Sequence, residues 1–328
     1  MSLFATRSNL VGILSAVGAS FFFSINDVTV KLLSGDYALH QIILIRSIIG
    51  MAVLMAVIVP IEGGWAVLRT KRPLMHMFRG VCLVFANMAF FLALAALPLA
   101  DAVAIFFVSP LIITIFSIVF LGEKVGPRRW IAVGIGLVGV IFMVRPGSAS
   151  FQLAALLPLV AAVSYAGLQT LTRKIGGTEK AGTLTFYIQV TFIFVGVLMG
   201  LFVSDGRFAG TGDPSLDFLL REWVWPTLAD WWILLILGVS STFAGYFISQ
   251  AYRLCEAGLA APFEYVAMIL AIIWGVIVFG EWPDAIAWLG ISLIISGGLF
   301  MLWREALANR ADRKSVVEGK SVDLGGRR

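Results

Sequence analysis

Long apolar runs separated by short polar breaks dominate the hydropathy pattern of this chain. Each run holds about 20 residues, the length that an α-helix needs to cross the hydrocarbon core of a bilayer. Because lipid offers no hydrogen-bond partner to backbone groups, runs without the alternation of barrel strands must be helical. The pattern predicts ten membrane-spanning helices, at residues 8–32, 38–61, 73–97, 100–121, 128–145, 150–172, 181–203, 229–252, 258–280 and 284–304.

The composition of the chain agrees with that pattern and leaves little room for a soluble domain. Of 328 residues, 60% are hydrophobic and 13% are charged, and the mean hydropathy is +0.96. An ordinary soluble domain carries about 25% charged residues. We therefore expect an all-α membrane protein with ten transmembrane helices, followed by a charged cytoplasmic tail at residues 305–328.

Lysine and arginine residues gather in alternate loops, which sets the expected orientation. Residues 69–72 and 124–129 hold basic clusters. The opposite loops hold four basic residues, Lys31, Arg145, Arg207 and Arg221. Because basic residues accumulate on the cytoplasmic side of membrane proteins, both termini are expected in the cytoplasm and loop 204–228 outside. Charge that sorts by loop in this way does not indicate a nucleic-acid partner.

One short phrase occurs twice in the chain. FLGEKVGPRRW at residues 120–130 returns as VFGEWPDAIAW at residues 278–288, with Gly, Glu and Trp at the same spacing. Aligning the two Gly-Glu pairs gives an offset of 158 residues, and the match continues without a gap on both sides. We expect these corners to be structural hinges between consecutive helices, at Gly122, Glu123, Gly280 and Glu281.

The first predicted helix aligns with the sixth at a different offset, 143 residues, which pairs Lys31 with Lys174. The chain is therefore expected to contain two five-helix repeats, residues 1–146 and 147–304. An odd number of helices in each repeat places the second copy in the membrane in the opposite sense. Inverted repeats are characteristic of secondary transporters, because two related halves can open in turn to either side. The sequence thus predicts transport by alternating access.

Five plus five helices, a Gly-Glu corner after the fourth and ninth, and glycine-rich fifth and tenth helices resemble the EamA type of the drug/metabolite transporter superfamily. The resemblance covers residues 8–304, and the chain looks most like bacterial exporters of amino acids, including aromatic ones. The resemblance implies a central cavity lined by the first four helices of each repeat. It also implies a bacterial inner (cytoplasmic) membrane protein that exports amino acids or similar small metabolites. We expect no cofactor and no bound metal.

Polar side chains inside the predicted helices are the candidate substrate contacts, because such residues are costly in lipid and usually face a cavity or one another. Tyr and Gln occur four positions apart on two helices, so each pair shares one helical face. Amide, phenol and phenyl groups suit a small zwitterion with an apolar side chain. Hydrogen bonds that merely hold the bundle together are the competing interpretation. The candidate set is Asn26, Arg46, Asn87, Tyr165, Gln169, Tyr187, Tyr246, Gln250, Glu264 and Tyr265.

Three ionisable residues stand out within the predicted helices. Asp27 and Arg46 lie at similar depth for a rise of about 1.5 Å per residue, so an ion pair is one interpretation. Capture of a substrate carboxylate by Arg46 is the other. Glu264 has Phe106 as its repeat partner and breaks the symmetry. It is a candidate for binding a substrate amine or a coupling proton, with a structural role as the alternative.

An intramembrane enzyme is the main alternative of a different class. The chain contains neither an H-E-x-x-H nor a G-x-S-x-G motif, so a metalloprotease or serine hydrolase is not expected. Among transporters, a nucleotide-sugar or phosphate-ester carrier should place several basic residues in the cavity. Only Arg46 lies clearly within a predicted helix core. A broad drug exporter would share an apolar aromatic cavity and stays open as an alternative.

Overall fold

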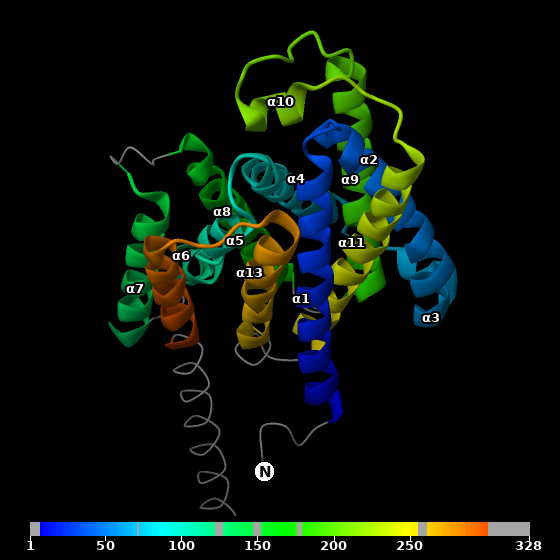
Figure 1. Ribbon diagram of the computed structural model, residues 1–328. Coiled ribbons are helices and arrows are strands. Elements are labelled where there is room, and N and C mark those ends of the chain that lie inside the picture. The colour runs from blue at the N-terminus through cyan, green and yellow to red at the C-terminus, as the bar shows by residue number, and fades with distance from the viewer. Residues whose placement is uncertain are drawn as a thin grey trace, which may run out of the picture.

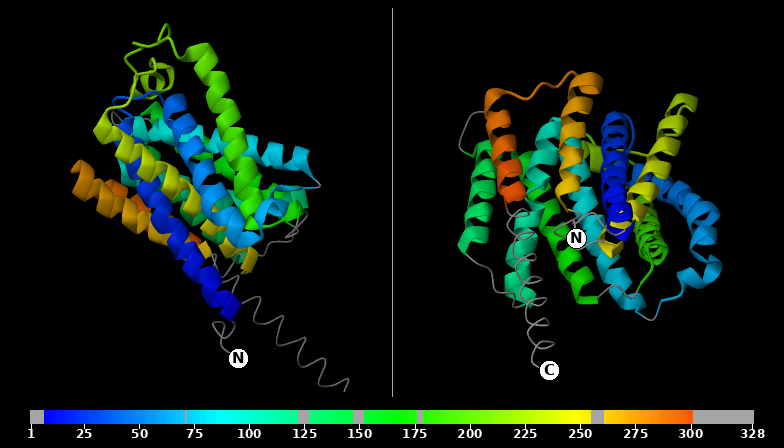
Figure 2. Two further views of the ribbon diagram at one scale, coloured as in Figure 1. Left: turned by 90° about the vertical axis from the view of Figure 1, so that its right-hand side faces the viewer. Right: turned by 90° about the horizontal axis from the view of Figure 1, so that it is seen from below.

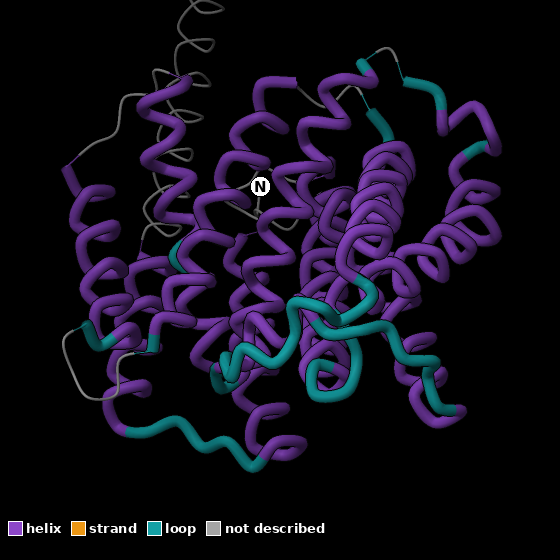
Figure 3. The backbone as a smooth tube through the Cα atoms, turned by 90° about the horizontal axis from the view of Figure 1, so that it is seen from above, coloured by secondary structure: helices purple, strands orange, loops and turns teal. Residues whose placement is uncertain are grey.

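The computed structural model of the protein describes residues 7–70, 72–121, 127–146, 152–175, 179–254 and 261–300. Helices and loops make up this part of the chain, and no strand occurs within it (Figure 3). The expected all-α class is therefore confirmed. The longer helices are α1 (Arg7–Leu33), α2 (Leu39–Val53), α4 (Pro73–Ala96), α7 (Pro127–Val144), α8 (Leu157–Ile175), α9 (Ala181–Val203), α11 (Leu228–Leu254) and α13 (Val266–Phe279).

Seven helices among the described residues are long and apolar enough to cross a membrane, judged by length and composition. They coincide, within a few residues at each end, with seven of the predicted apolar runs. Three shorter apolar helices, Gly134–Val144, Phe263–Phe279 and Ala285–Phe300, fall within the three other predicted runs. The first Gly-Glu corner, Gly122 and Glu123, lies outside the described residues.

Short irregular elements extend two of the spans. α2 continues through a π-helical turn, η1 (Leu54–Ile58), into α3 (Val59–Glu62), and the 3₁₀ turn η2 (Gly64–Leu68) follows. α8 is preceded by the 3₁₀ turn η3 (Leu153–Leu156). The second and sixth predicted helices are therefore found where they are expected, but each combines α-helix with a π-helical or 3₁₀ segment.

The fourth predicted helix, at residues 100–121, is divided in two. α5 (Leu99–Phe106) ends before residues 107–108, and α6 (Ser109–Leu121) begins after them. Pro110 is the second residue of α6, where its missing N–H would have no partner within the helix in any case. A proline in this apolar run therefore starts a new helix instead of kinking a continuous one.

The ninth predicted helix is irregular at the equivalent place. The 3₁₀ turn η4 (Ala261–Tyr265) precedes α13. At the offset of 158 residues Phe107 corresponds to Tyr265, and the rings of these two residues contact each other, with centroids 5.0 Å apart. The irregular points of the two spans therefore meet inside the bundle.

Two helix pairs dominate the packing of the bundle. α1 packs against α11, and α4 packs against α8 (Figures 1 and 2). In the alignment of the two sequence halves, α1 corresponds to α8 and α11 corresponds to α4, so the two pairs are equivalent. α2 and α9, the second helix of each half, also pack against one another.

α7 and the helix Ala285–Phe300 lie together at one edge of the bundle (left in Figure 1). A Cβ atom on Gly139 would come within 2.9 Å of the carbonyl oxygen of Gly290. These two glycines therefore let the helix backbones approach closely, as small residues do in membrane bundles.

The segment between α9 and α11 folds over the end of the bundle at which α1 terminates (top in Figure 1). It contains α10 (Pro214–Leu220), whose N-cap residue Asp213 accepts a hydrogen bond from Ser215 N–H at 2.9 Å. Ser215 Oγ donates to the carbonyl of Leu92 at 2.8 Å, and Phe218 is fully buried. The segment is thus packed onto the helices beneath it.

Candidate functional site

Arg46 of α2 is a buried cation at the meeting point of four helices. Its guanidinium lies 5.2 Å from the ring centroid of Phe91 on α4 and 4.8 Å from that of Phe192 on α9. Its Nη1 donates to Oδ1 of Asn26 on α1 at 3.3 Å. The residue is 3% exposed. Two aromatic faces and an amide therefore hold a planar cation among apolar helices.

Asp27 reaches Arg46 through Asn26. Asn26 Nδ2 donates to Oδ1 of Asp27 at 3.1 Å, while Asn26 Oδ1 accepts from Arg46. Among the ion pairs of the described residues, none joins Asp27 directly to Arg46. The structure thus places an amide between the two charges, and no carboxylate of the described residues forms an ion pair with the guanidinium.

A second group of candidates surrounds η4. The side chains of Tyr165 and Gln169 on α8 interact, and the centroid of the Tyr165 ring lies 5.5 Å from that of Phe106. Glu264 interacts electrostatically with the phenols of Tyr165 and Tyr265. The predicted i, i+4 pair on α8 therefore exists, and it lies beside the carboxylate that breaks the repeat.

The equivalent pair on α11 is also formed. Gln250 Nε2 donates to the Tyr246 hydroxyl at 2.8 Å. Next to it, Phe22 of α1 stacks on Phe243 and Phe247 of α11, with ring centroids 5.4 Å and 5.8 Å apart. The contact between α1 and α11 thus combines stacked rings with an amide and a phenol.

Three polar atoms of the candidate set are buried without a hydrogen-bond partner in the described part of the chain. They are Arg46 Nε, Gln250 Oε1 and the Tyr265 hydroxyl. A buried polar atom without a partner costs about 1–3 kcal/mol, so natural proteins retain few of them. These atoms retain the capacity to bind a polar solute.

Tyr187 and Asn87 are the two remaining candidates of the set. Tyr187 stacks on His76 of α4, with centroids 4.9 Å apart, and its hydroxyl donates to the carbonyl of Leu68 at 3.2 Å. Asn87 Nδ2 donates to the carbonyl of Leu83, one turn earlier on the same helix, at 3.2 Å. The structure therefore gives Tyr187 and Asn87 protein partners of their own.

His76 was not among the sequence candidates, yet it is 2% exposed. Its Nε2 lies 3.7 Å from Oε1 of Glu179, which also accepts a hydrogen bond from Thr70 Oγ1 at 2.8 Å. Arg79, three residues after His76 on α4, is buried as well. The signal for this group was the i, i+3 spacing of two basic residues within an apolar run.

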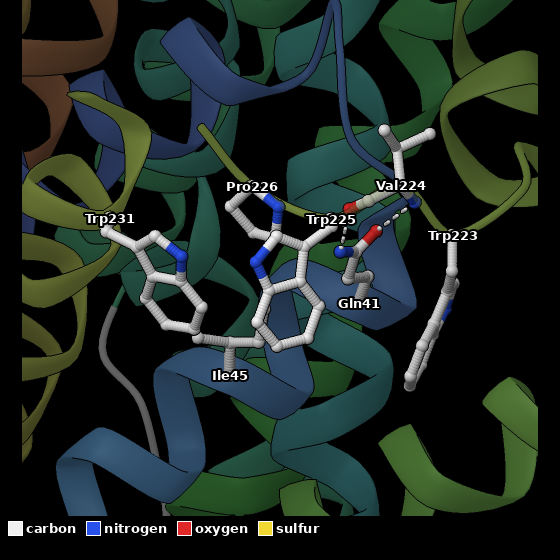
Figure 4. A pocket seen from close by; sticks show the side chains of 7 residues that line it. All are labelled: Gln41, Ile45, Trp223, Val224, Trp225, Pro226 and Trp231. Atoms are coloured by element: carbon white, nitrogen blue, oxygen red, sulfur yellow. Dashed lines mark hydrogen bonds between the residues drawn. The ribbon is translucent and has the colours of Figure 1, made fainter. Parts of the chain in front are cut away.

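A separate pocket of about 250 Å³ lies between the start of α2 and the segment before α11 (Figure 4). Tryptophans 223, 225 and 231 line it, and the amide of Gln41 exchanges two hydrogen bonds with the backbone of Val224. None of the predicted substrate contacts lines this pocket. Tryptophan at this level fits the aromatic belt of a membrane interface.

The described residues contain no group of three or more His, Cys, Asp or Glu side chains able to hold a metal ion.

Comparison with known proteins places this geometry in a family context. The EamA-like transporter family model matches residues 10–145 and 152–303. A riboflavin transporter of Rhizobium johnstonii is 31% identical over 247 residues, 75% of this chain and 76% of the relative. An S-adenosylmethionine uptake transporter of Rickettsia prowazekii is 26% identical over 86% of this chain and 89% of the relative. A pseudopaline exporter of Pseudomonas aeruginosa is 30% identical over 87% of this chain and 93% of the relative.

A solved crystal structure is similar to the chain with a TM-score of 0.60. The match covers 92% of this chain and 98% of the other, at 22% sequence identity. At this identity the likeness shows a shared fold.

Proposed function

The chain belongs to the EamA-like transporter family, and we propose that it is a secondary transporter that exports amino acids or similar small metabolites by alternating access. It is an integral membrane protein and not an enzyme. The proposal places the solute among α1, α2, α8, α11 and η4, in the bacterial inner membrane.

Two observations support an inverted repeat as the basis of transport. The family model matches one segment in each half of the chain, residues 10–145 and 152–303. The pairs α1–α11 and α4–α8 are equivalent under the sequence alignment, as are the contacting rings of Phe107 and Tyr265. Related packings in two halves allow two states of similar energy, one open to each side.

The observation that carries the binding site is the set of three buried polar atoms without partners, on Arg46, Gln250 and Tyr265. An arginine fork can bind a carboxylate by two parallel hydrogen bonds. The carboxylate of Glu264 lies beside the phenols of Tyr165 and Tyr265, and the ring of Phe22 stacks on that of Phe243. A zwitterion with an apolar or aromatic side chain offers a chemical partner to each of these kinds of group.

Metabolites that carry an aromatic heterocycle are the second candidate class. The names of the relatives favour them, because riboflavin and S-adenosylmethionine both contain flat heterocycles. The stacked rings of Phe22, Phe243 and Phe247 would accommodate such a group. The names of the relatives include both an uptake transporter and an exporter. Export, as the direction of transport in this chain, is therefore itself proposed.

Counterflow in proteoliposomes tests the proposal. Vesicles are loaded with one unlabelled amino acid, riboflavin or S-adenosylmethionine, and entry of the labelled form is followed. A carrier gives a transient accumulation that depends on the internal solute, because both move through the same alternating site. Absence of counterflow for every amino acid would refute the first class, and absence for both classes would refute the proposed substrates.

A further inference from the structure

The second Gly-Glu corner forms an ion pair with the end of α1. Oε1 of Glu281 lies 2.7 Å from Nζ of Lys31. The two side chains are 11% (Lys31) and 28% (Glu281) exposed, so water reaches the pair only in part. Salt screens such a shielded pair less than a pair on the open surface.

The same two side chains also hold the turn between α4 and α5. Lys31 Nζ donates to the carbonyl of Leu97 at 2.6 Å, and Oε2 of Glu281 accepts from Leu99 N–H at 2.9 Å. Leu99 begins α5, where backbone N–H groups have no partner within the helix and a carboxylate is favoured. Lys31 Nζ also lies 5.1 Å from the ring centroid of Phe279.

The backbone at Gly280 directs Glu281 toward Lys31. Gly280 has φ 67° and ψ 17°, the left-handed conformation that glycine adopts without steric cost. Glu281 N–H donates to the carbonyl of Gly275 at 2.9 Å, which closes the end of α13. The glycine therefore makes the turn, and the glutamate makes the contact to the first half of the chain.

These contacts join the two halves at one end of the bundle. α1 and the α4–α5 turn belong to the first half, and the end of α13 belongs to the second. We infer that Lys31 and Glu281 form an outer latch, a pair that stabilises the state in which the pathway is closed to the outside; this rests on the proposed alternating access. A contact made in one state alone shifts the equilibrium toward that state.

A reporter cysteine behind the latch tests this inference. Cys82→Ser and Cys255→Ser remove the natural thiols, and Ser24→Cys adds one on α1, at a position that is 3% exposed and accepts a hydrogen bond from Trp274 Nε1 of α13 at 3.2 Å. Right-side-out vesicles are treated with a membrane-impermeant thiol reagent. Glu281→Gln is expected to raise the labelling rate by about fivefold or more, the lower end of common coupling strengths.

A second latch variant and a control variant complete the test. Lys31→Met removes the pair from the other side and should raise labelling in the same way. Asp205→Asn is the matched control, because the Arg207–Asp205 pair is exposed, at 57% for both side chains. It should leave labelling unchanged.

Unchanged labelling in both latch variants would overturn the inference. An equal rise in inside-out vesicles would also overturn it, since that result indicates general loosening. The assay needs no solute, so its outcome is independent of whether counterflow identifies the substrate.

Discussion

The outer latch and the centre of the bundle both bury charge among apolar helices, but they satisfy it differently. Lys31 and Glu281 each engage the other and a backbone group of the α4–α5 turn. Arg46 and Gln250 each retain a buried polar atom without a protein partner in the described part of the chain. This difference favours two separate roles. The latch holds two parts of the fold together, and the polar atoms at the centre bind a solute.

Arg46→Lys should have the largest effect on this comparison. Lysine keeps the charge but loses the planar fork that binds a carboxylate and stacks between Phe91 and Phe192. We expect counterflow to fall by about 100-fold, equivalent to about 2.7 kcal/mol. The melting temperature should change little, since the charge and much of the packing remain. Counterflow that survives within twofold would mean that Arg46 is structural.

Gly298→Ala should come next, because it moves Tyr265 directly. A Cβ at Gly298 would overlap the hydroxyl of Tyr265, so the ring must shift. Overpacking of this kind costs about 1–3 kcal/mol, measured as a lower melting temperature. Gly134→Ala on α7 is the matched control, since a Cβ there meets nothing within 4 Å. A stable Gly298→Ala protein would show that the ring has room to move.

Gln250→Leu removes one of the buried atoms without a partner among the described residues and should reduce counterflow less than Arg46→Lys does. Loss of one neutral hydrogen bond to the solute is worth about 1 kcal/mol, so we expect about a five- to tenfold weaker counterflow. Gln152, exposed before η3, offers the control substitution Gln152→Leu. If Gln250→Leu and Gln152→Leu reduced counterflow equally, Gln250 would not be a substrate contact.

Asp284→Ala should have the smallest effect and concerns stability alone. Oδ1 of Asp284 accepts from Ala287 N–H at 2.8 Å and pairs with Arg145, which holds the pKa of Asp284 below its usual 3.8. Loss of such a cap costs about 1 kcal/mol. A lowered folded-state pKa contributes stability above pH 3.8, and that contribution is lost as the pH falls through the lowered pKa.

The difference in melting temperature between the unmodified protein and Asp284→Ala should therefore be constant from pH 5 to 8 and shrink in acid. A difference that grows in acid would contradict the assigned direction of the shift.

The apolar runs predicted the positions of the helices well, because membrane burial imposes a length and a composition on each span. The i, i+4 pairs Tyr165–Gln169 and Tyr246–Gln250 were also within reach of the sequence, since helical geometry alone brings them together. The π-helical turn at Leu54–Ile58 had no comparable signal. Local periodicity does not specify such a turn.

Contacts between distant segments were the part that the sequence left open. The repeat aligned Glu281 with Glu123, yet nothing in the alignment indicated that Glu281 would pair with Lys31. Tyr187 stacks on His76, a contact set by how α4 and α9 pack. Asn26 between Asp27 and Arg46 likewise depends on the rotation of α1 against α2. These features need the tertiary structure, because spacing along one helix does not fix a neighbour's rotation.

A ligand-induced thermal shift across three proteins tests the central claim most directly. The unmodified protein, Arg46→Lys and Glu281→Gln are melted with and without the solute that gives counterflow, because a ligand that binds the folded state raises the melting temperature. Solute should stabilise the unmodified protein and Glu281→Gln, and the shift should be lost in Arg46→Lys. A full shift in Arg46→Lys would contradict a substrate site at the centre.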